Sequence, residues 1–403
     1  MSLILMKFGG TSVSTDEARK AAYKKVILAI DRGDKVAVVI SAMGRRGDPY
    51  ATDTLLSLVG PTVNKRDKDL LMSTGELISA VVMSDMLNDN GYAAHAVTGY
   101  QAGILTDEVY GSAKCISVNP SYLNELLEKG ITPVITGFQG VFGSNQITTL
   151  GRGGSDTSAV IVGAALKADL VEIYTDVDGI MTADPKIVPK AKFIDIINTD
   201  ELFQMAEQGA KVIHPKAVEI SKEHSLKMCV RNTFSDLPGT VIIDRQLQHD
   251  PKNINDVVSS IALLKNRTQF TVSRVGESDE HRLLTLLAEK GISLDLINIF
   301  PNSIVFTIDS GAQNSCEEVI GLLGFSYEKK ESLAKITAIG AKMHGVPGVM
   351  AKIVTALLEN GIEILQSADS HLSISCLIKE EDGEKAANAL HKEFIEANIE
   401  FEG

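Results

Sequence analysis

The sequence predicts an α/β protein: an αβα sandwich with a mostly parallel sheet, followed by two small α+β units of βαββ type. Two observations support this prediction. Residues 1–245 alternate strand-like and helix-like segments, which is the pattern of a parallel sheet covered by helices on both faces. After a polar stretch at 246–260, interpreted as a linker, the sequence repeats itself. A length of 403 residues is enough for two or three domains.

The alternation begins at the N-terminus. Leu3–Phe8 reads as a buried strand that ends at Gly9–Gly10, and Asp16–Asp31 then carries apolar residues at helical spacing. Lys35–Ser41 is a continuous run rich in β-branched residues, as expected for a strand covered on both faces. Asp67–Asn90 is a long helical stretch.

The same pattern continues to the end of the first domain. Ile131–Phe138 is predicted as a strand, and Ser155–Lys167 as an Ala-rich helix that directly follows a glycine-rich loop. Two further strands are predicted at Asp169–Thr175 and Lys227–Asn232.

The internal repeat has an offset of 70 residues and no gaps. It places Leu283 on Ile353, and each copy reads as a strand, a helix ending in Gly, a strand, a turn and a strand. Two copies are too few for a solenoid, which needs three or more. We therefore predict two modules, residues 261–330 and 331–403, that pack on each other or on a second chain. Other matched pairs are Leu287 with Leu357, Gly291–Ile292 with Gly361–Ile362, and Ser303–Ile304 with Ser373–Ile374.

Composition narrows the class of protein. Lys and Arg number 39 against 52 Asp and Glu, a net charge of −13, so the chain repels nucleic acid. No apolar run approaches the ~20 residues of a membrane span, and the apolar start is too short for a signal peptide. We expect a soluble cytoplasmic protein without nucleic-acid or membrane partners. Its cysteines are far apart, as in a reducing compartment: Cys115, Cys229, Cys316 and Cys376.

The segment KFGGTS places a cation beside a glycine turn. Lys7 ends a predicted strand, and Gly9 and Gly10 let backbone N–H groups approach phosphate oxygens closely. The alternative is a tight structural turn, which is common after a strand.

A second segment, TTLGRGGSDTSA, combines a planar cation with a helix start. Arg152 offers a fork suited to a carboxylate, while Ser155 and Asp156 lie where a helix begins and an anion can bind. The alternative is that Ser155 or Asp156 only caps the helix, and both interpretations can hold together. The loop's glycines are Gly151, Gly153 and Gly154.

A third segment, YTDVDGIMTADPK, follows a strand and holds Asp176, Asp178 and Asp184, then Pro185 and Lys186. Asp-Gly and Asp-Pro also mark ordinary turns, and the spacing is not that of an EF-hand. The loop can frame a nucleotide, with Lys186 reaching its phosphates. The P-loop, GxGxxG, HExxH and GxSxG patterns do not occur in the sequence.

These segments, together with STGE, make the chain resemble the aspartokinases of the amino acid kinase family over essentially its whole length. The resemblance implies an amino acid kinase-like αβα sandwich followed by two ferredoxin-like ACT domains. It also implies transfer of the ATP γ-phosphoryl group to the β-carboxylate of L-aspartate, giving 4-phospho-L-aspartate. This reaction is the first step of lysine, threonine and methionine (diaminopimelate) biosynthesis.

The resemblance also assigns roles. Lys7 stabilises the transferring phosphoryl group, Asp156 organises Lys7 and the substrate, and Glu76 holds the substrate ammonium. The implied aspartate contacts are Ser41, Thr52, Glu76, Arg152, Gly153, Gly154 and Ser155, although the loop SAMGRRGDPYATDT departs from the family's common SAMGKTT. The implied ATP contacts are Lys7, Phe8, Gly9, Gly10, Thr175, Asp176, Met181, Thr182, Ala183, Asp184, Pro185, Lys186 and Lys211.

The chemistry of phosphoryl transfer to a carboxylate is consistent with these implied residues. A carboxylate is already ionised at neutral pH, so its attack on phosphorus needs no general base. We expect alignment and charge neutralisation to suffice, with Mg²⁺ carried by ATP and no metal ligands from protein side chains.

The two repeats differ ahead of their helices, where the first has VGESDEH. One interpretation is an acidic first turn favoured by the helix dipole. The other is that these acids, with Asp295, bind the cationic side chain of lysine as an inhibitor across a dimer interface; threonine is the alternative effector. We expect a homodimer or a dimer of dimers through the ACT domains. The predicted effector residues are Ser273, Glu277, Ser278, Asp279, Glu280, Leu294 and Asp295.

Alternatives to an aspartokinase remain at this point. One is a kinase of the same family that acts on acetylglutamate, glutamate or a nucleotide, and another is an inactive amino-acid sensor with the same fold.

Overall fold

The computed structural model describes residues 1–143, 145–210, 212–244, 257–273, 279–340, 343 and 346–396. The chain forms two compact units. The first comprises Met1–Ile180, Phe193–Ala206 and Lys211–Leu247, and the second comprises Met181–Lys192, Glu207–Ala210 and Gln248–Gly403. The predicted domain boundaries stay a prediction, and most of the proposed linker lies outside the described residues.

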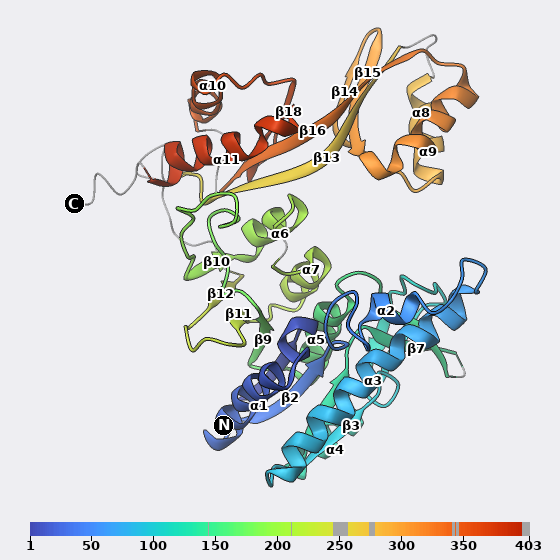
Figure 1. Cartoon of the computed structure of the whole chain (residues 1–403), viewed down its shortest axis with the longest axis vertical. Helices are drawn as coiled ribbons and strands as arrows, with labels where there is room; N and C mark the ends of the chain where they lie inside the picture. The colour runs from blue at the N-terminus through green and yellow to red at the C-terminus, as the bar shows by residue number, and fades with distance from the viewer. Residues whose placement is uncertain are drawn as a thin grey trace. The chain divides into compact units, whose positions relative to one another are not determined.

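The first unit is built on an eight-stranded sheet with the order β10-β12-β11-β9-β1-β2-β6-β3 (Figure 1). Every pairing is parallel except that of β11 with β12, so the predicted mostly parallel sheet is confirmed. The strands are β1 (Leu3–Phe8), β2 (Lys35–Ile40), β3 (Ala94–Val97), β6 (Thr132–Thr136), β9 (Leu170–Thr175), β10 (Ile196–Asn198), β11 (Met228–Asn232) and β12 (Thr240–Ile243).

Helices cover both faces of this sheet, which completes the predicted αβα sandwich. α1 (Asp16–Asp31) and α3 (Lys65–Asp89) bury apolar side chains against the face that carries Met6 and Phe8. α5 (Gly154–Leu166) packs on β1, β2 and β9 from the other face, where the alternation of a strand directs Lys7. α2 (Thr52–Leu56), α4 (Ser121–Glu128), α6 (Thr199–Glu207) and α7 (Pro215–Glu223) are shorter.

The sequence did not predict a second, four-stranded sheet in this unit. Its order is β5-β4-β7-β8, formed by Cys115–Val118, Ile104–Thr106, Gln139–Phe142 and Gln146–Thr149. Strands of three or four residues are too short to give a periodic signal, so they depend on tertiary pairing.

α3 is long and apolar enough to cross a membrane by length and composition alone. It packs instead against β3, β6 and β8 of its own unit and buries the carboxylates of Asp69 and Glu76. We therefore interpret α3 as a core helix.

The second unit contains a six-stranded antiparallel sheet with the order β14-β15-β13-β16-β18-β17. The long central strands β13 (Ser260–Ser273) and β16 (Tyr327–Ile339) pair along their length, so the two repeats share one sheet. The outer strands are β14 (Asp295–Phe300), β15 (Ser303–Asp309), β17 (Gln366–Asp369) and β18 (Ser373–Lys379).

Each repeat has its own apolar core. Leu283 of α8 (Asp279–Glu289) and Ile353 of α10 (Val349–Glu359) are buried at equivalent positions, as the repeat predicts. Each repeat also ends in a second helix that the sequence did not predict, α9 (Gln313–Leu323) or α11 (Gly383–His391). These helices match weakly in sequence: buried Cys316 in α9 corresponds to buried Ala386 in α11.

Candidate functional site

The candidate site of the first unit lies at the carboxyl ends of its parallel strands. β9, β1 and β2 are neighbours in that order, so the loops that follow them meet at one edge of the sheet. These loops contain Asp176, Gly9–Gly10 and residues 41–51 respectively. The start of α5 approaches the same edge through Asp156, which contacts Lys7.

Lys7 and Asp156 form a nearly buried ion pair. The Lys7 Nζ lies 2.5 Å from Asp156 Oδ1, and the two side chains are 11% and 14% exposed. The other oxygen of Asp156 accepts a hydrogen bond from the backbone N–H of His214 at 3.3 Å. Asp156 therefore holds the Lys7 ammonium in place, and its role toward the substrate stays a prediction.

The glycine turn beside Lys7 is held by close backbone contacts. Gly9 N donates to Tyr174 O at 3.3 Å, and Gly44 N donates to Gly10 O at 2.9 Å. A Cβ on Gly10 would lie 2.6 Å from Gly44 O, so a larger residue cannot fit there without a backbone shift. The turn lies beside the Lys7 ammonium, since a Cβ on Gly9 would be 3.6 Å from the Lys7 Nζ.

The loop before α5 has a similar requirement at Gly153. Its φ of +66° is left-handed, and a Cβ there would lie 2.2 Å from the His214 ring. Arg152, the residue before it, is exposed, and no ion pair of Arg152 is found in the described part of the chain. Its guanidinium is therefore available to a carboxylate.

Glu76 is buried, with 2% of the residue exposed. Its Oε1 accepts a hydrogen bond from the Ala42 N–H at 3.1 Å, while Oε2 has no partner among the described residues. Burial raises the pKa of this carboxyl to about 8. A buried carboxylate with one free oxygen favours a cationic partner, because an ammonium offsets its desolvation.

The loop after β2 lies beside Glu76. A Cβ on Gly75 would approach Ala42 and the Tyr50 carbonyl oxygen to 2.8 Å, so this loop packs directly on α3. Ser41 N donates to Phe8 O at 3.1 Å, and Thr52 is the first residue of α2. The structure therefore gathers Ser41 and Glu76 near the end of β1. A direct substrate contact of Thr52 stays a prediction.

The predicted nucleotide residues divide between the units. Thr175 ends β9 and Asp176 follows it in the first unit, whereas 181–186 belong to the second unit. Within the second unit Thr182 is buried, and Ala183 belongs to its apolar core. Lys211 lies outside the described residues.

The sequence did not predict a set of hydrogen-bonded polar residues near the carboxyl ends of β1, β9 and β11. Thr233 Oγ1 donates to Ser12 Oγ at 2.7 Å, and both side chains are buried. Thr233 N donates to Thr175 O at 2.9 Å, and Asn232 Nδ2 donates to Asp178 Oδ1 at 2.9 Å. These bonds fix the loop after β9 against the glycine turn. The only sequence signal was that Asn232 ends a predicted strand and Thr233 directly follows it.

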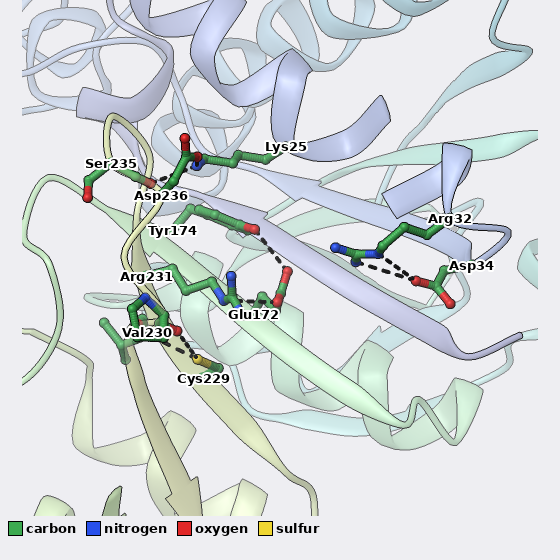
Figure 2. Close-up of polar contacts among 11 residues, drawn as sticks. Lys25, Arg32, Asp34, Glu172, Tyr174, Cys229, Val230, Arg231, Ser235 and Asp236 are labelled. Carbon is green, nitrogen blue, oxygen red and sulfur yellow. Dashed lines mark hydrogen bonds and ion pairs between the residues drawn. The ribbon is translucent and has the colours of Figure 1, made fainter. Parts of the chain in front are cut away.

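Figure 2 shows a second part of this support. The Tyr174 hydroxyl donates to buried Glu172 at 2.9 Å, and Arg231 Nε lies 3.1 Å from the same carboxylate. Burial and the nearby Glu172 charge raise the pKa of Tyr174, so its phenol stays protonated. The Tyr174 ring stacks on Phe8 at 4.8 Å between centroids, which ties this cluster to the strand that carries Lys7.

In the second unit, Asp295 already has a cationic partner. Lys335 of the neighbouring repeat is 4% exposed, and its Nζ contacts Asp295 Oδ2. Asp279 and Glu280 lie in the first turn of α8, as the helix-dipole interpretation expects. Ser273 pairs with Ser303, and Leu294 packs on the core of the first repeat. Glu277 and Ser278 lie outside the described residues.

The described residues contain no group of three His, Cys, Asp or Glu side chains that could hold a metal ion.

Comparisons with known proteins bear on the family of the chain and on its fold. Residues 2–232 match the amino acid kinase family, and residues 328–392 match an ACT domain. Aspartokinase 1 of Bacillus subtilis (strain 168) is 44% identical over 403 residues, covering 98% of this chain and 99% of that protein.

Two similar solved structures are of E. coli aspartokinase III. The complex with aspartate and ADP (R-state) has a TM-score of 0.79 and 24% identity, covering 97% of this chain and 99% of that chain. The complex with lysine and aspartate (T-state) has a TM-score of 0.76 and 25% identity, covering 98% and 99%. At this identity the likeness to the aspartate and ADP complex supports the fold.

Proposed function

The chain belongs to the aspartokinases of the amino acid kinase family, and on this premise we propose how its site performs the reaction and how it is regulated. The proposed reaction is transfer of the γ-phosphoryl group of ATP to the β-carboxylate of L-aspartate. The main observation in favour of an amino-acid substrate is Glu76. It is a buried carboxylate, and one of its oxygens has no partner among the described residues. An amino-acid ammonium supplies the charge and donors that this oxygen lacks.

The rest of the aspartate site follows from charge. The exposed Arg152 guanidinium can donate two parallel hydrogen bonds to a substrate carboxylate, with Ser155 adding a hydrogen bond from the start of α5. Ser41, Thr52, Gly153 and Gly154 complete the proposed set. We assign Arg152 and Glu76 to opposite charges of one zwitterionic substrate.

The transfer step needs no proton. A β-carboxylate oxygen forms a bond to the γ-phosphorus, and the bond from that phosphorus to the bridging oxygen breaks, with its electron pair leaving on ADP. Lys7 stabilises the charge on the transferring group, and Asp156 holds Lys7 in position. The backbone N–H of Gly10 adds a donor on the same side.

Nucleotide use fits this family, and ATP is the proposed phosphoryl donor. Its proposed contacts are those that the resemblance implies. They are Lys7, Phe8, Gly9, Gly10, Thr175, Asp176, Met181, Thr182, Ala183, Asp184, Pro185, Lys186 and Lys211. Mg²⁺ is proposed to arrive on the ATP phosphates, since this ion usually binds through substrate phosphates and few carboxylates.

The reaction is tested by incubating the protein with ATP and L-aspartate and trapping the acyl phosphate as a hydroxamate. Aspartate-dependent hydroxamate with matching ADP release supports the proposal. Activity with glutamate or acetylglutamate in place of aspartate contradicts it. ADP release without aspartate is the background to subtract.

We further propose that lysine inhibits the enzyme through the first repeat, in the pathway that leads to lysine, threonine and methionine. The support is chemical. Asp295 forms an ion pair with the ammonium of Lys335, so its surroundings are suited to a bound ammonium group. Assays with lysine, threonine and both test this, and inhibition by threonine alone contradicts it. A cytoplasmic homodimer or dimer of dimers through the ACT domains completes the proposal.

A further inference from the structure

Arg45 has no role among the residues assigned above, yet its side chain reaches the nucleotide side of the site. Its Nη2 lies 2.7 Å from Asp176 Oδ2. Arg45 follows β2 and Asp176 follows β9, and β1 lies between these two strands in the sheet. The ion pair therefore connects the two outer loops across the end of β1, where Lys7 and the glycine turn lie.

The backbone that carries Arg45 is fixed on the glycine turn. Gly44 N donates to Gly10 O at 2.9 Å, one residue before Arg45. The Asp48 carboxylate accepts the Arg45 N–H at 2.7 Å, and Asp48 N donates to Arg45 O at 2.9 Å. The main chain of Arg45 is thus held in place while its side chain extends over the edge of the sheet.

The two cations at this edge differ in how firmly they are paired. Lys7 is almost buried against Asp156, whereas the Arg45 and Asp176 side chains are 72% and 40% exposed. An exposed pair of this kind contributes little to stability, so it exchanges partners easily. A phosphate carries more negative charge than one carboxylate and matches the planar guanidinium fork.

We propose that Arg45 binds the terminal phosphate of ATP. Its guanidinium leaves Asp176 and donates charge-assisted hydrogen bonds to oxygens of the γ-phosphoryl group, as a second cation beside Lys7. This inference rests on the proposed function and adds a phosphate-contacting residue to it. Such a contact stabilises the charge that spreads over the γ-phosphoryl oxygens during transfer.

The test compares Arg45→Ala and Arg45→Lys with Arg46→Ala. Arg46 is the adjacent exposed arginine, and no ion pair of its side chain is found in the described part of the chain, so it controls for loss of one positive charge. Calorimetry measures binding of Mg·ADP and of the non-hydrolysable analogue Mg·AMP-PNP. We expect Arg45→Ala to weaken AMP-PNP binding by about tenfold or more and to leave ADP binding unchanged. Arg45→Lys should recover part of the loss, and Arg46→Ala should match the wild type.

Equal losses for ADP and AMP-PNP, or no loss for either, overturn the inference. Unchanged melting temperatures of the variants exclude a general folding defect. The result of this binding experiment can be told apart from the result of the aspartate assay. A wild-type protein that binds nucleotide but releases no ADP with aspartate contradicts the proposed reaction, whereas the role of Arg45 is judged by nucleotide binding alone.

Discussion

The His391 Nε2 lies 2.9 Å from the Thr182 Oγ1, although 209 residues separate the two in the sequence. His391 is fully buried, and its Nδ1 lies 3.2 Å from Glu396 Oε1. Thr182 belongs to the segment Met181–Lys192, which folds with the C-terminal repeats rather than with the sheet that precedes it. This contact fastens part of the predicted nucleotide segment into the second unit.

The His391 contact predicts a pH-dependent stability of the second unit. Burial lowers the pKa of His391 below its usual 6.5, with Glu396 opposing and Lys190 and Lys192 adding to the shift. A lowered pKa means that the folded state binds the proton more weakly than the unfolded state, so stability is lost as pH falls below about 6.5. We expect His391→Gln to have a smaller drop in melting temperature between pH 7 and pH 5 than wild type.

Exposed His95 supplies the control, because His95→Gln should keep the wild-type pH dependence. An identical pH dependence in His391→Gln and wild type would show that His391 does not titrate in this range.

Glu76 predicts a pH dependence of aspartate binding. Its pKa is raised to about 8 by burial, so below that pH it must lose a proton before it can pair with an ammonium. Aspartate affinity, measured by calorimetry, should therefore rise between pH 6.5 and pH 8. Glu76→Gln should weaken aspartate binding by about 100-fold and remove this dependence. Asp85→Asn, an exposed change on the same helix, should alter neither.

The same raised pKa has a consequence for stability. The folded protein holds the Glu76 proton more tightly than the unfolded chain, so this contribution is complete below the unfolded value of about 4.5 and is lost as pH rises through 8. At pH 9, Glu76→Gln should melt higher than wild type in the absence of aspartate. A lower melting temperature of the variant at pH 9 would contradict the burial argument.

Lys7→Ala should reduce kcat by at least about 100-fold while the KM for aspartate stays within a few-fold of wild type. The reason is that Lys7 is assigned to the transferring phosphoryl group rather than to the amino acid. Steady-state rates with both substrates varied give the two parameters. Lys35→Ala, at the first residue of the neighbouring strand, should leave them unchanged. A kcat within a few-fold of wild type would refute the assignment of Lys7.

Gly10→Ala should abolish most activity, since its Cβ would lie 2.6 Å from Gly44 O and 2.9 Å from Ala42 O. The added methyl group pushes the loop after β2 away from the glycine turn. Gly60→Ala places a Cβ with nothing within 4 Å and should behave like wild type. Equal activity of the two variants in the hydroxamate assay would show that the close approach is unimportant.

Lys335→Met should lower the lysine concentration needed for half-inhibition, because it removes the ammonium that competes for Asp295. Asp295→Asn should raise that concentration. Lys330→Met, an exposed change on the same strand, is the control. Inhibition curves measured at fixed aspartate decide the point, and an unchanged curve in both Asp295→Asn and Lys335→Met would remove Asp295 from the effector site.

Much of the fold could be predicted from local patterns. Leu3–Phe8 and Asp16–Asp31 have the predicted bounds, because a buried strand and an amphipathic helix carry their own periodic signals. The 70-residue offset also placed Leu283 and Ile353 correctly in two equivalent cores. The second helices of the repeats and the small four-stranded sheet were missed, since their short segments gain stability mainly from tertiary contacts.

The sequence by itself determined the family, the mostly parallel sheet and the identity of the charged groups: Lys7, Glu76, Arg152 and Asp156. These follow from residue types and short-range order along the chain. Only the tertiary structure decided which other charges meet, because the ion pairs of Arg45 with Asp176 and of Lys335 with Asp295 join segments that are distant in sequence. Burial, which raises the pKa of Glu76, likewise arises only when α3 packs in the fold.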